Sequence, residues 1–195
     1  SMEVINYGAI ITNLYVPDSS GSLKDVVLGF NDFNNYYENN PYFGAIIGRY
    51  GNRISNGTFL LDGVRYELEQ NNGPNSLHGG LVGFDKVFWK FVEEKSNNQS
   101  LYFEYFSKDM EEGFPGNLVV GVEYILNDSN ELKIKYTAST DKKTIINLTQ
   151  HSYFNLSGES SGDILDHILN IDAEYYLPVN ENMIPHGPYE KVEST

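Results

Sequence analysis

His151 is the residue of this chain best suited to acid–base chemistry. It lies in the run Ile146–Leu156 (INLTQHSYFNL), where a strand-like alternation of apolar and polar residues ends at an imidazole flanked by Gln150 and Ser152. An imidazole titrates near neutral pH, so it can donate or accept a proton without a strongly perturbed environment. The alternative is a structural histidine satisfied by neighbouring polar groups, as most buried polar side chains are. Other segments have to decide between these interpretations.

Two glycine-containing loops carry further candidate site residues. The loop Gly48–Ile54 (GRYGNRI) places the amide of Asn52 beside the permanent cation of Arg53, a combination suited to the hydroxyl groups of a sugar. The alternative there is a surface turn whose arginines pair with acidic residues. The loop Asn75–Gly80 (NSLHGG) places His78 before two glycines, which allow a ligand to approach the backbone closely.

Other chemistries have less support. Phe84, Phe88 and Trp89 could form an apolar wall beside the second loop, but we expect Phe84 and Phe88 to be core residues. Metal binding by His78 and His151 lacks a supporting ligand pattern such as His-x-Glu. The Gly-x-Ser-x-Gly match at residues 158–162 lacks the helix that follows a nucleophile elbow. His167 and His186 have no partner pattern, so we expect both at the surface.

The elements that must position these residues are predicted to be β-strands. Asp62 and Gly63 form a strong two-residue hairpin signal between two of them, and only residues 32–40 hint at a helix. Many short strands with turns rich in Gly and Asn indicate an all-β fold, an antiparallel β-sandwich or barrel, in one domain of 195 residues. The predicted strands are Ala9–Val16, Lys24–Gly29, Gly57–Leu61, Val64–Leu68, Ser100–Phe106, Leu118–Leu126 and Glu131–Thr137.

Composition narrows the range of partners. The formal net charge is −14, which disfavours nucleic acid, an anionic membrane surface and a phosphorylated substrate, and favours a neutral small molecule. The chain has no cysteine, so disulfides and thiolate metal sites are excluded. No apolar run approaches the roughly 18–20 residues that span a bilayer. We therefore expect a cytoplasmic protein.

Taken together, the motifs resemble those of the aldose 1-epimerase (galactose mutarotase) family. The resemblance implies a large antiparallel β-sandwich with a sugar-binding cleft and no metal or organic cofactor. It also implies interconversion of the α and β anomers of a free aldohexose such as galactose or glucose. The matching segments occur in the order expected of the family: Asn6–Ala9, Gly48–Ile54, Asn75–Gly80, Gly83–Lys86, Glu112–Gly116, Asn147–Leu156 and Pro178–Pro185.

The resemblance implies a role for each candidate residue. His151 is expected to be the general acid, aimed at the ring oxygen of the sugar. His78 resembles the second imidazole of the site, which binds near the ring oxygen or a neighbouring hydroxyl and counts as both catalytic and substrate-binding. Asn52 and Arg53 resemble the pair that orients the substrate. Gln150 stands where the family often has Asn and keeps the amide.

The resemblance further implies that residues 1–195 are a partial domain, with the sandwich incomplete at its C-terminus. The catalytic base of the family, a glutamate, is expected beyond Thr195, and neither Glu181 nor Glu190 is assigned to that role. We therefore expect the chain alone to be inactive. An incomplete sandwich leaves strand edges and an apolar face uncovered, so self-association is also expected.

A different class of function remains open, namely a carbohydrate-binding module that recognises a sugar without turning it over. It would use Asn52, Arg53 and His78 together with stacking aromatic residues. A hexose-6-phosphate epimerase is a further option within the enzyme class. That site needs a cationic cluster for the phosphate, and 13 Lys and Arg against 27 Asp and Glu give it little support.

Overall fold

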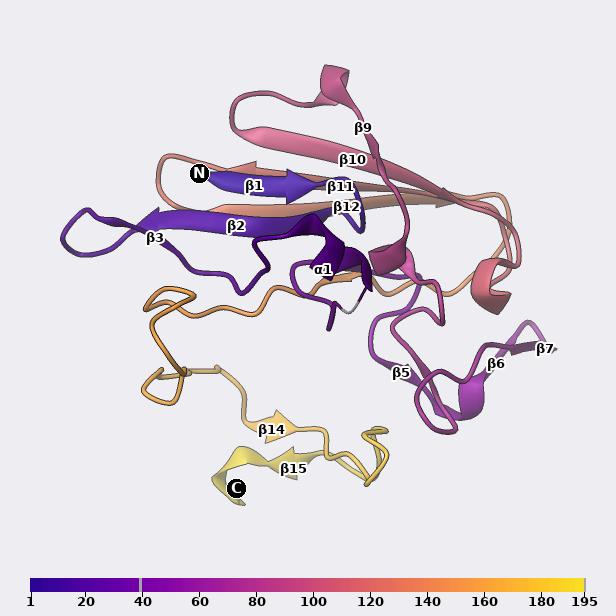
Figure 1. Cartoon of the computed structure of the whole chain (residues 1–195). Helices are drawn as coiled ribbons and strands as arrows, with labels where there is room; N and C mark the ends of the chain where they lie inside the picture. Colours follow the sequence, from indigo (N-terminus) through magenta and orange to yellow (C-terminus); the bar gives the residue numbers. More distant parts are fainter. Residues whose placement is uncertain (39, 195) are drawn as a thin grey trace.

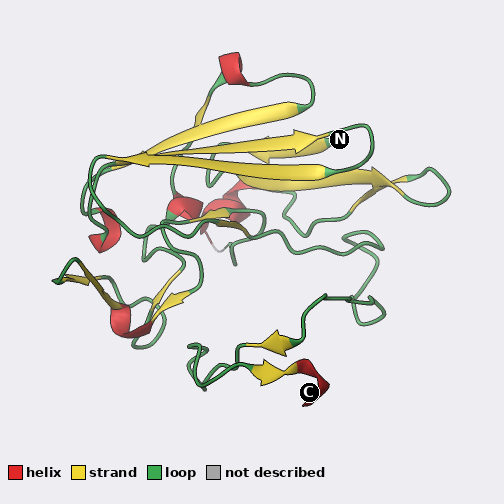
Figure 2. Cartoon of the chain, turned by 180° about the vertical axis from the view of Figure 1, so that it is seen from behind, coloured by secondary structure: helices red, strands yellow, loops and turns green. Residues whose placement is uncertain are grey.

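The computed structural model describes residues 1–38 and 40–194, and its regular elements are mostly antiparallel strands (Figure 1, Figure 2). The strands are β1 (Met2–Ile5), β2 (Ile10–Pro17), β3 (Leu23–Asp25), β4 (Ile46–Ile47), β5 (Arg53–Ile54), β6 (Thr58–Leu61), β7 (Val64–Glu67), β8 (Ser76–Leu77), β9 (Lys90–Phe91), β10 (Ser100–Ser107), β11 (Leu118–Leu126), β12 (Leu132–Thr140), β13 (Thr149–Gln150), β14 (Tyr175–Tyr176) and β15 (Glu190–Lys191). The helix is α1 (Phe33–Glu38), and the 3-10 turns are η1 (Ser55–Gly57), η2 (Phe84–Lys86), η3 (Glu93–Lys95), η4 (Glu111–Gly113) and η5 (Val192–Ser194).

The largest sheet has the strand order β12-β11-β10-β9, and all its pairs are antiparallel. The alternation of β11 sends one set of side chains inward, and Leu118, Val120, Val122 and Tyr124 are each at most 1% exposed. The turn to β12 is closed by Asn127, whose Oδ1 accepts the backbone N–H groups of residues 129 and 131 at 3.0 Å each. A short-range turn and a period of two therefore fix the register of these strands.

A second sheet, β1-β2-β3, packs on the first. The two share one hydrophobic core that contains Ile11, Trp89 and Phe103. A hydrogen bond crosses this core, because the Tyr124 hydroxyl donates to the backbone oxygen of Ala9 at 2.7 Å. Two antiparallel sheets around one core form a β-sandwich, so the predicted fold class is confirmed.

Local predictions hold where a short turn joins neighbouring strands. β6 and β7 form the predicted hairpin, with positive φ at Asp62 (52°) and Gly63 (81°), as a type I′ turn requires. α1 confirms the helix within residues 32–40, of which residue 39 lies outside the described part. Phe84 is buried at 1% exposure as expected, but the core prediction for Phe88 is wrong because 60% of it is exposed.

The segment 146–156 is mainly irregular, although its alternation predicts a strand. Only β13 pairs regularly, with β4. Single bridges join Asn147 to Tyr50 and Phe154 to Val27. The segment thus bonds to several elements one after another and does not pair along a single neighbouring strand. This path places His151 next to the chain around residues 44–50.

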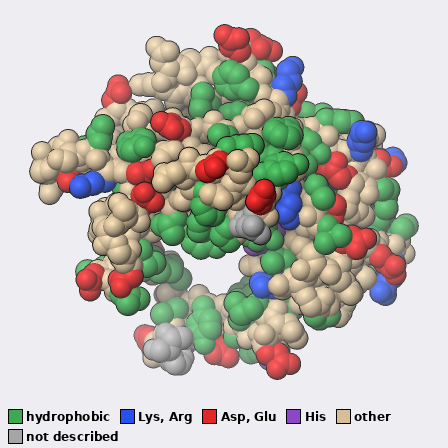
Figure 3. All heavy atoms as spheres, in the orientation of Figure 1, with side chains coloured by type: hydrophobic (Ala, Val, Ile, Leu, Met, Phe, Trp, Pro, Cys, Tyr) green, Lys and Arg blue, Asp and Glu red, His purple; other side chains and the backbone are tan. Residues whose placement is uncertain are grey.

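Residues 157–194 extend away from the sandwich and end in the β14–β15 hairpin (Figure 1). Their apolar side chains are largely exposed, with Leu165 at 85%, Ile168 at 97% and Leu169 at 82%. In Figure 3, hydrophobic side chains border an open gap between this segment and the rest of the molecule. None of the described helices is long and apolar enough to cross a membrane.

Candidate active site

The two glycine-containing loops pack directly against each other. β5 of the first loop pairs with β8 of the second, with Arg53 opposite Leu77. A Cβ atom on Gly79 would collide with the backbone oxygen of Gly48, so only glycine permits this approach. Asn52 and His78 both have positive φ, at 64° and 54°. The sequence therefore brings the amide–guanidinium pair and the first imidazole to one place.

His78 and Asn52 are joined by two hydrogen bonds. The backbone N–H of His78 donates to the backbone oxygen of Asn52 at 3.0 Å. The backbone N–H of Asn52 in turn donates to His78 Nδ1 at 3.0 Å. Because Nδ1 accepts a hydrogen bond, the proton of the neutral ring lies on Nε2. His78 can thus present an Nε2–H donor in a fixed direction.

The charge state of His78 follows from its surroundings. Burial above all, together with the positive charges of His151 and Arg53, lowers the pKa of the His78 imidazole from 6.5 to about 4. A desolvated imidazole near other cations disfavours its protonated form. At neutral pH His78 is therefore an uncharged hydrogen-bond donor.

Asn52 and Arg53 hold each other in place. Arg53 Nη1 donates to Asn52 Oδ1 at 3.2 Å, and Arg53 Nε donates to Asn72 Oδ1 at 2.9 Å. Within residues 1–38 and 40–194, Arg53 Nη2 and Asn52 Nδ2 make no hydrogen bond. Both groups can therefore donate to a ligand while their other atoms keep the side chains oriented.

His151 is held through its backbone. Its N–H donates to the backbone oxygen of Ala45 at 2.9 Å, and its own oxygen accepts from the N–H of Gly44 at 3.3 Å. Gln150 Nε2 donates to the Gly44 oxygen at 2.9 Å and so fixes the same segment. The rings of His151 and His78 lie perpendicular, with centroids 5.1 Å apart. The two imidazoles predicted to share a site do converge.

Tyr42 is a site residue that sequence reasoning missed. Its ring centroid lies 4.7 Å from that of His78 and 5.5 Å from that of His151, so it contacts both imidazoles. Burial raises the pKa of the Tyr42 phenol, and the negative charge of Asp85 raises it further, which keeps the hydroxyl protonated. The available signal was its place at the start of the loop that leads to Asn52 and Arg53.

Asp85 is a buried carboxylate close to this cluster. It is 5% exposed, its Oδ1 has no partner among the described residues, and its Oδ2 lies 3.7 Å from Lys86 Nζ. Burial raises the pKa of the Asp85 carboxyl, while the positive charges of Lys86 and His151 oppose that rise. A group so enclosed can influence the imidazoles electrostatically but offers little surface to a ligand.

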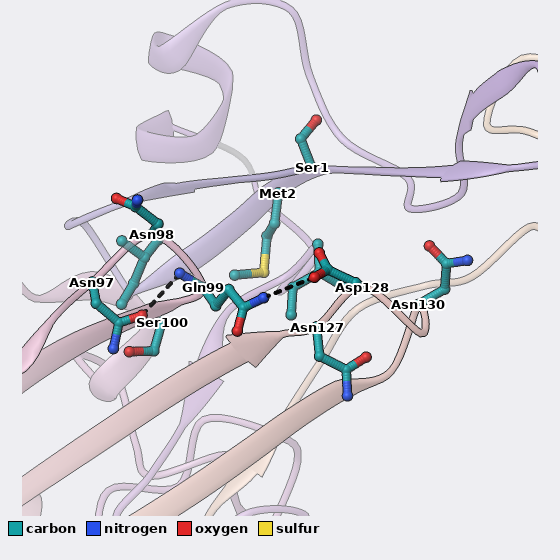
Figure 4. A pocket seen from close by; sticks show the side chains of 11 residues that line it. Ser1, Met2, Asn97, Asn98, Gln99, Ser100, Asn127, Asp128 and Asn130 are labelled. Carbon is teal, nitrogen blue, oxygen red and sulfur yellow. Dashed lines mark hydrogen bonds between the residues drawn. The ribbon is translucent and has the colours of Figure 1, made fainter.

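Two hollows elsewhere are separate from this cluster. One of about 460 Å³ lies at the ends of β10 and β11 and is lined mainly by polar residues, among them Asn97, Asn98 and Asn130 (Figure 4). Another of about 630 Å³ lies between β2 and β12 and is mainly apolar. Neither is lined by His78 or His151. Among the described residues, no group of three or more His, Cys, Asp and Glu side chains could hold a metal ion.

Fold and site together define a class of protein, an antiparallel β-sandwich whose loops bring two imidazoles, a tyrosine and an amide–guanidinium pair to one surface. A family model described as aldose 1-epimerase matches residues 1–195. The chain belongs to this family, as its motifs indicate.

Individual relatives agree with this assignment. The chain is 48% identical over 194 residues to a galactose mutarotase from Sus scrofa and 41% identical to an aldose 1-epimerase from Escherichia coli (strain K12). These alignments cover 100% of the chain but 56% and 55% of the relatives, so the chain spans about half the length of the curated relatives it matches.

Solved structures show the same fold. A GalM/aldose epimerase homologue from C. elegans superposes with a TM-score of 0.93 at 32% identity, covering 100% of this chain and 58% of the other. A galactose 1-epimerase from Lactobacillus acidophilus NCFM superposes with a TM-score of 0.82 at 29% identity, covering 100% and 56%.

Proposed function

We propose that this chain forms the acid side of an aldose 1-epimerase site, which interconverts the α and β anomers of free hexoses such as galactose and glucose. The observation that carries the proposal is the convergence of His78 and His151, 5.1 Å apart, with Asn52 hydrogen-bonded to His78 at 3.0 Å. The names of the relatives, galactose mutarotase and aldose 1-epimerase, support it.

The reaction needs two simultaneous proton transfers on one hemiacetal. A base removes the proton of the C1 hydroxyl, the bond between C1 and the ring oxygen breaks, and His151 protonates the ring oxygen. The open-chain aldehyde then rotates about C1–C2 and closes by the reverse transfers, which gives the other anomer. A well-placed acid or base contributes about 10²–10⁴-fold to the rate.

Environment separates the roles of the two imidazoles. A pKa of about 4 keeps His78 uncharged at neutral pH, so it is a poor proton reservoir but a good fixed donor to the ring oxygen or a neighbouring hydroxyl. This leaves the acid role to His151. Dividing roles between similar groups through their surroundings is a common arrangement in active sites.

No carboxylate among the described residues is assigned to the base. Glu190 accepts a hydrogen bond from the Tyr176 hydroxyl at 2.6 Å in the β14–β15 hairpin. Asp85 is only 5% exposed. The proposal therefore keeps the expectation that the base is supplied from outside residues 1–195, and that these residues alone have negligible mutarotase activity.

The proposal is tested in a protein that contains this chain and has the full length of the family's members, called here the family-length protein. Polarimetry on fresh α-galactose or α-glucose measures its activity. His151→Ala should lower kcat by about 10²–10⁴-fold, because the ring oxygen loses its acid. His186→Ala, which alters an exposed histidine, should leave the rate unchanged. An unimpaired His151→Ala enzyme would refute the assignment.

A sugar-binding module without catalysis is the second candidate. It is favoured by the fact that Asn52, Arg53 and His78 are already oriented by one another, independently of any base. Calorimetric titration with galactose alongside polarimetry separates the two candidates. Binding with no acceleration of mutarotation in the family-length protein would favour the module.

A further inference from the structure

The turn that follows His78 is held by a side chain from a distant part of the sequence. Leu81 and Val82 are 56% and 50% exposed, yet the Glu112 carboxylate accepts both of their backbone N–H groups. Oε2 accepts from Leu81 at 2.8 Å and Oε1 from Val82 at 3.2 Å. Both carboxylate oxygens of Glu112 thus accept hydrogen bonds from one exposed turn. These hydrogen bonds are charge-assisted and therefore stronger than bonds between neutral groups.

The fit between Glu112 and the turn is close. Glu112 lies in η4, between β10 and β11, with a φ of 49°, which is a strained conformation for a residue with a side chain. A Cβ atom on Gly80 would collide with Glu112 Oε2. Glycine at position 80 and a left-handed residue at position 112 are therefore both needed for the carboxylate to reach the two N–H groups.

A cation holds the same turn from its other side. Lys86 Nζ donates to the backbone oxygen of Leu81 at 2.8 Å. The same ammonium lies 3.7 Å from Asp85 Oδ2 and 5.9 Å from the ring centroid of Tyr42. The Leu81 residue is thus bonded to an anion through its N–H and to a cation through its oxygen. The cation, in turn, adjoins the tyrosine that contacts both imidazoles.

The start of the loop has its own anchor, which is neutral. Asn71 Oδ1 accepts the N–H of Leu77 at 2.7 Å, and its Nδ2 donates to the oxygens of Leu77 and Gly80 at 2.9 and 2.8 Å. Loss of Glu112 would therefore free the N–H groups of Leu81 and Val82, while Asn71 still holds Leu77 and Gly80 and Lys86 still holds the Leu81 oxygen. Asn71 thus brackets His78, and Glu112 fixes the two residues that follow Gly80.

We propose that Glu112 is a positioning residue for His78. By holding Leu81 and Val82, immediately after Gly80, it limits movement of the turn and so keeps the His78 ring bonded through Nδ1 to the Asn52 N–H, with Nε2–H pointing in one direction. The inference rests on the proposed function in one respect, because positioning matters for catalysis only if His78 contacts the sugar. Glutamine should replace Glu112 poorly, because its amide is uncharged and would turn a donor NH2 toward one of the two N–H groups in place of an acceptor oxygen.

Amide hydrogen exchange of the 195-residue chain, followed by NMR, tests the inference without any sugar. In Glu112→Gln, the amides of Leu81 and Val82 should exchange about tenfold faster or more, as expected from losing hydrogen bonds to a charged group, and the Asn52 amide should also exchange faster because the His78 ring that accepts it is no longer fixed. The amide of Tyr124 in the core should be unchanged. Glu94→Gln is the matched control, because Glu94 is exposed in another 3-10 turn and makes no hydrogen bond or ion pair among the described residues.

Two results would overturn the inference. Faster exchange at Leu81 and Val82 with an unchanged Asn52 amide would mean that Glu112 holds the turn without positioning His78. Equal acceleration at Tyr124 would mean a general loss of stability. Galactose titration of the same proteins tests the proposed function independently of the exchange experiment. If the unsubstituted chain and the family-length protein both fail to bind, the proposed function fails while the exchange result still decides the role of Glu112.

Discussion

Residues 1–156 and residues 157–194 use similar apolar side chains in opposite ways. In the first region Trp89 and Ile46 are at most 1% exposed, whereas in the second Ile168 is 97% exposed and Leu169 is 82% exposed. Apolar content is therefore not what separates them. The difference is that strands in the first region have partners on which to pack, and the candidate site lies where those partners fix the loops.

Long-range bonds embed the site loops in the first region. Arg49, next to the glycine that Gly79 contacts, is 2% exposed. Its guanidinium donates to Ser107 Oγ at 2.9 Å, to the Pro115 oxygen at 2.9 Å and to the Lys108 oxygen at 2.7 Å. The loop that carries Asn52 is thus tied to the loop after β10, which also supplies Glu112.

Bonds in the second region are mostly local. The Tyr176–Glu190 pair and the β14–β15 ladder lie within the segment itself. One tie back to the first region is the N–H of Leu156, which donates to His167 Nε2 at 3.0 Å. His167, expected at the surface, is half-buried and has this bond, whereas His186 is exposed as expected.

The largest expected effect is a difference in the free energy of unfolding between a substitution in the first region and one in the second. Trp89→Ala should lower the free energy of unfolding by about 3–5 kcal/mol, because it removes a large side chain from the closed core. Leu169→Ala should change it by less than about 0.5 kcal/mol, as expected of an exposed position. Urea unfolding followed by circular dichroism measures both. Similar losses would show that the second region is packed as well as the first.

A second prediction concerns association of the chain, which we propose from its exposed apolar surface. Replacing Leu165, Ile168 and Leu169 together with lysine should shift the protein toward monomer, because it removes the apolar surface that favours contact between copies. Light scattering over a range of concentrations measures the shift. A chain that is already a stable monomer before substitution would contradict the proposal.

A third and smaller effect concerns pH and the first region. Burial raises the pKa of Asp85 above its ordinary 3.8, so the folded state holds this proton more tightly than the unfolded chain. The stability that this group contributes is fully present below pH 3.8 and is lost as pH rises through the folded-state pKa. Asp85→Asn cannot titrate and should gain stability relative to the unsubstituted chain as pH increases.

Urea unfolding of both proteins from below pH 3.8 to pH 7 measures this difference. Titrating groups that do not interact with Asp85 contribute equally to both proteins and cancel when the unfolding free energies are subtracted, so the difference reports Asp85 together with the groups coupled to it, such as His151 and Lys86. A difference that stays constant with pH would contradict the account of Asp85.

Sequence patterns predicted the parts of the fold that depend on neighbours in the chain. β10, β11 and the β6–β7 hairpin follow from alternation and turn residues, because adjacent strands pair through short connections. The segment 146–156 could not be predicted in this way, since its hydrogen bonds go to several separate elements. Phe88 was placed in the core because its type favours burial, but it covers the buried Tyr7 from outside and is itself 60% exposed.

The candidate site was predicted by its motifs more than by any spacing. Residue type and loop context marked His78, His151, Asn52 and Arg53 as candidates, and the family resemblance implied their roles. Their convergence depends on loop packing that no local pattern encodes. Tyr42 was missed because, in an aromatic-rich sequence, its place at the start of the loop that leads to Asn52 and Arg53 does not set it apart until the two imidazoles are placed beside it. The cytoplasmic location expected from the sequence stays a prediction.

The most direct measurement follows the imidazole NMR signals of the chain during titration with galactose. If one hexose lies between the converging side chains, the signals of His78 and His151 should shift together with a single saturation curve. The His186 signal, from an exposed ring in the second region, should stay fixed. Shifts at only one of the two imidazoles, or at neither, would contradict the existence of a shared sugar site.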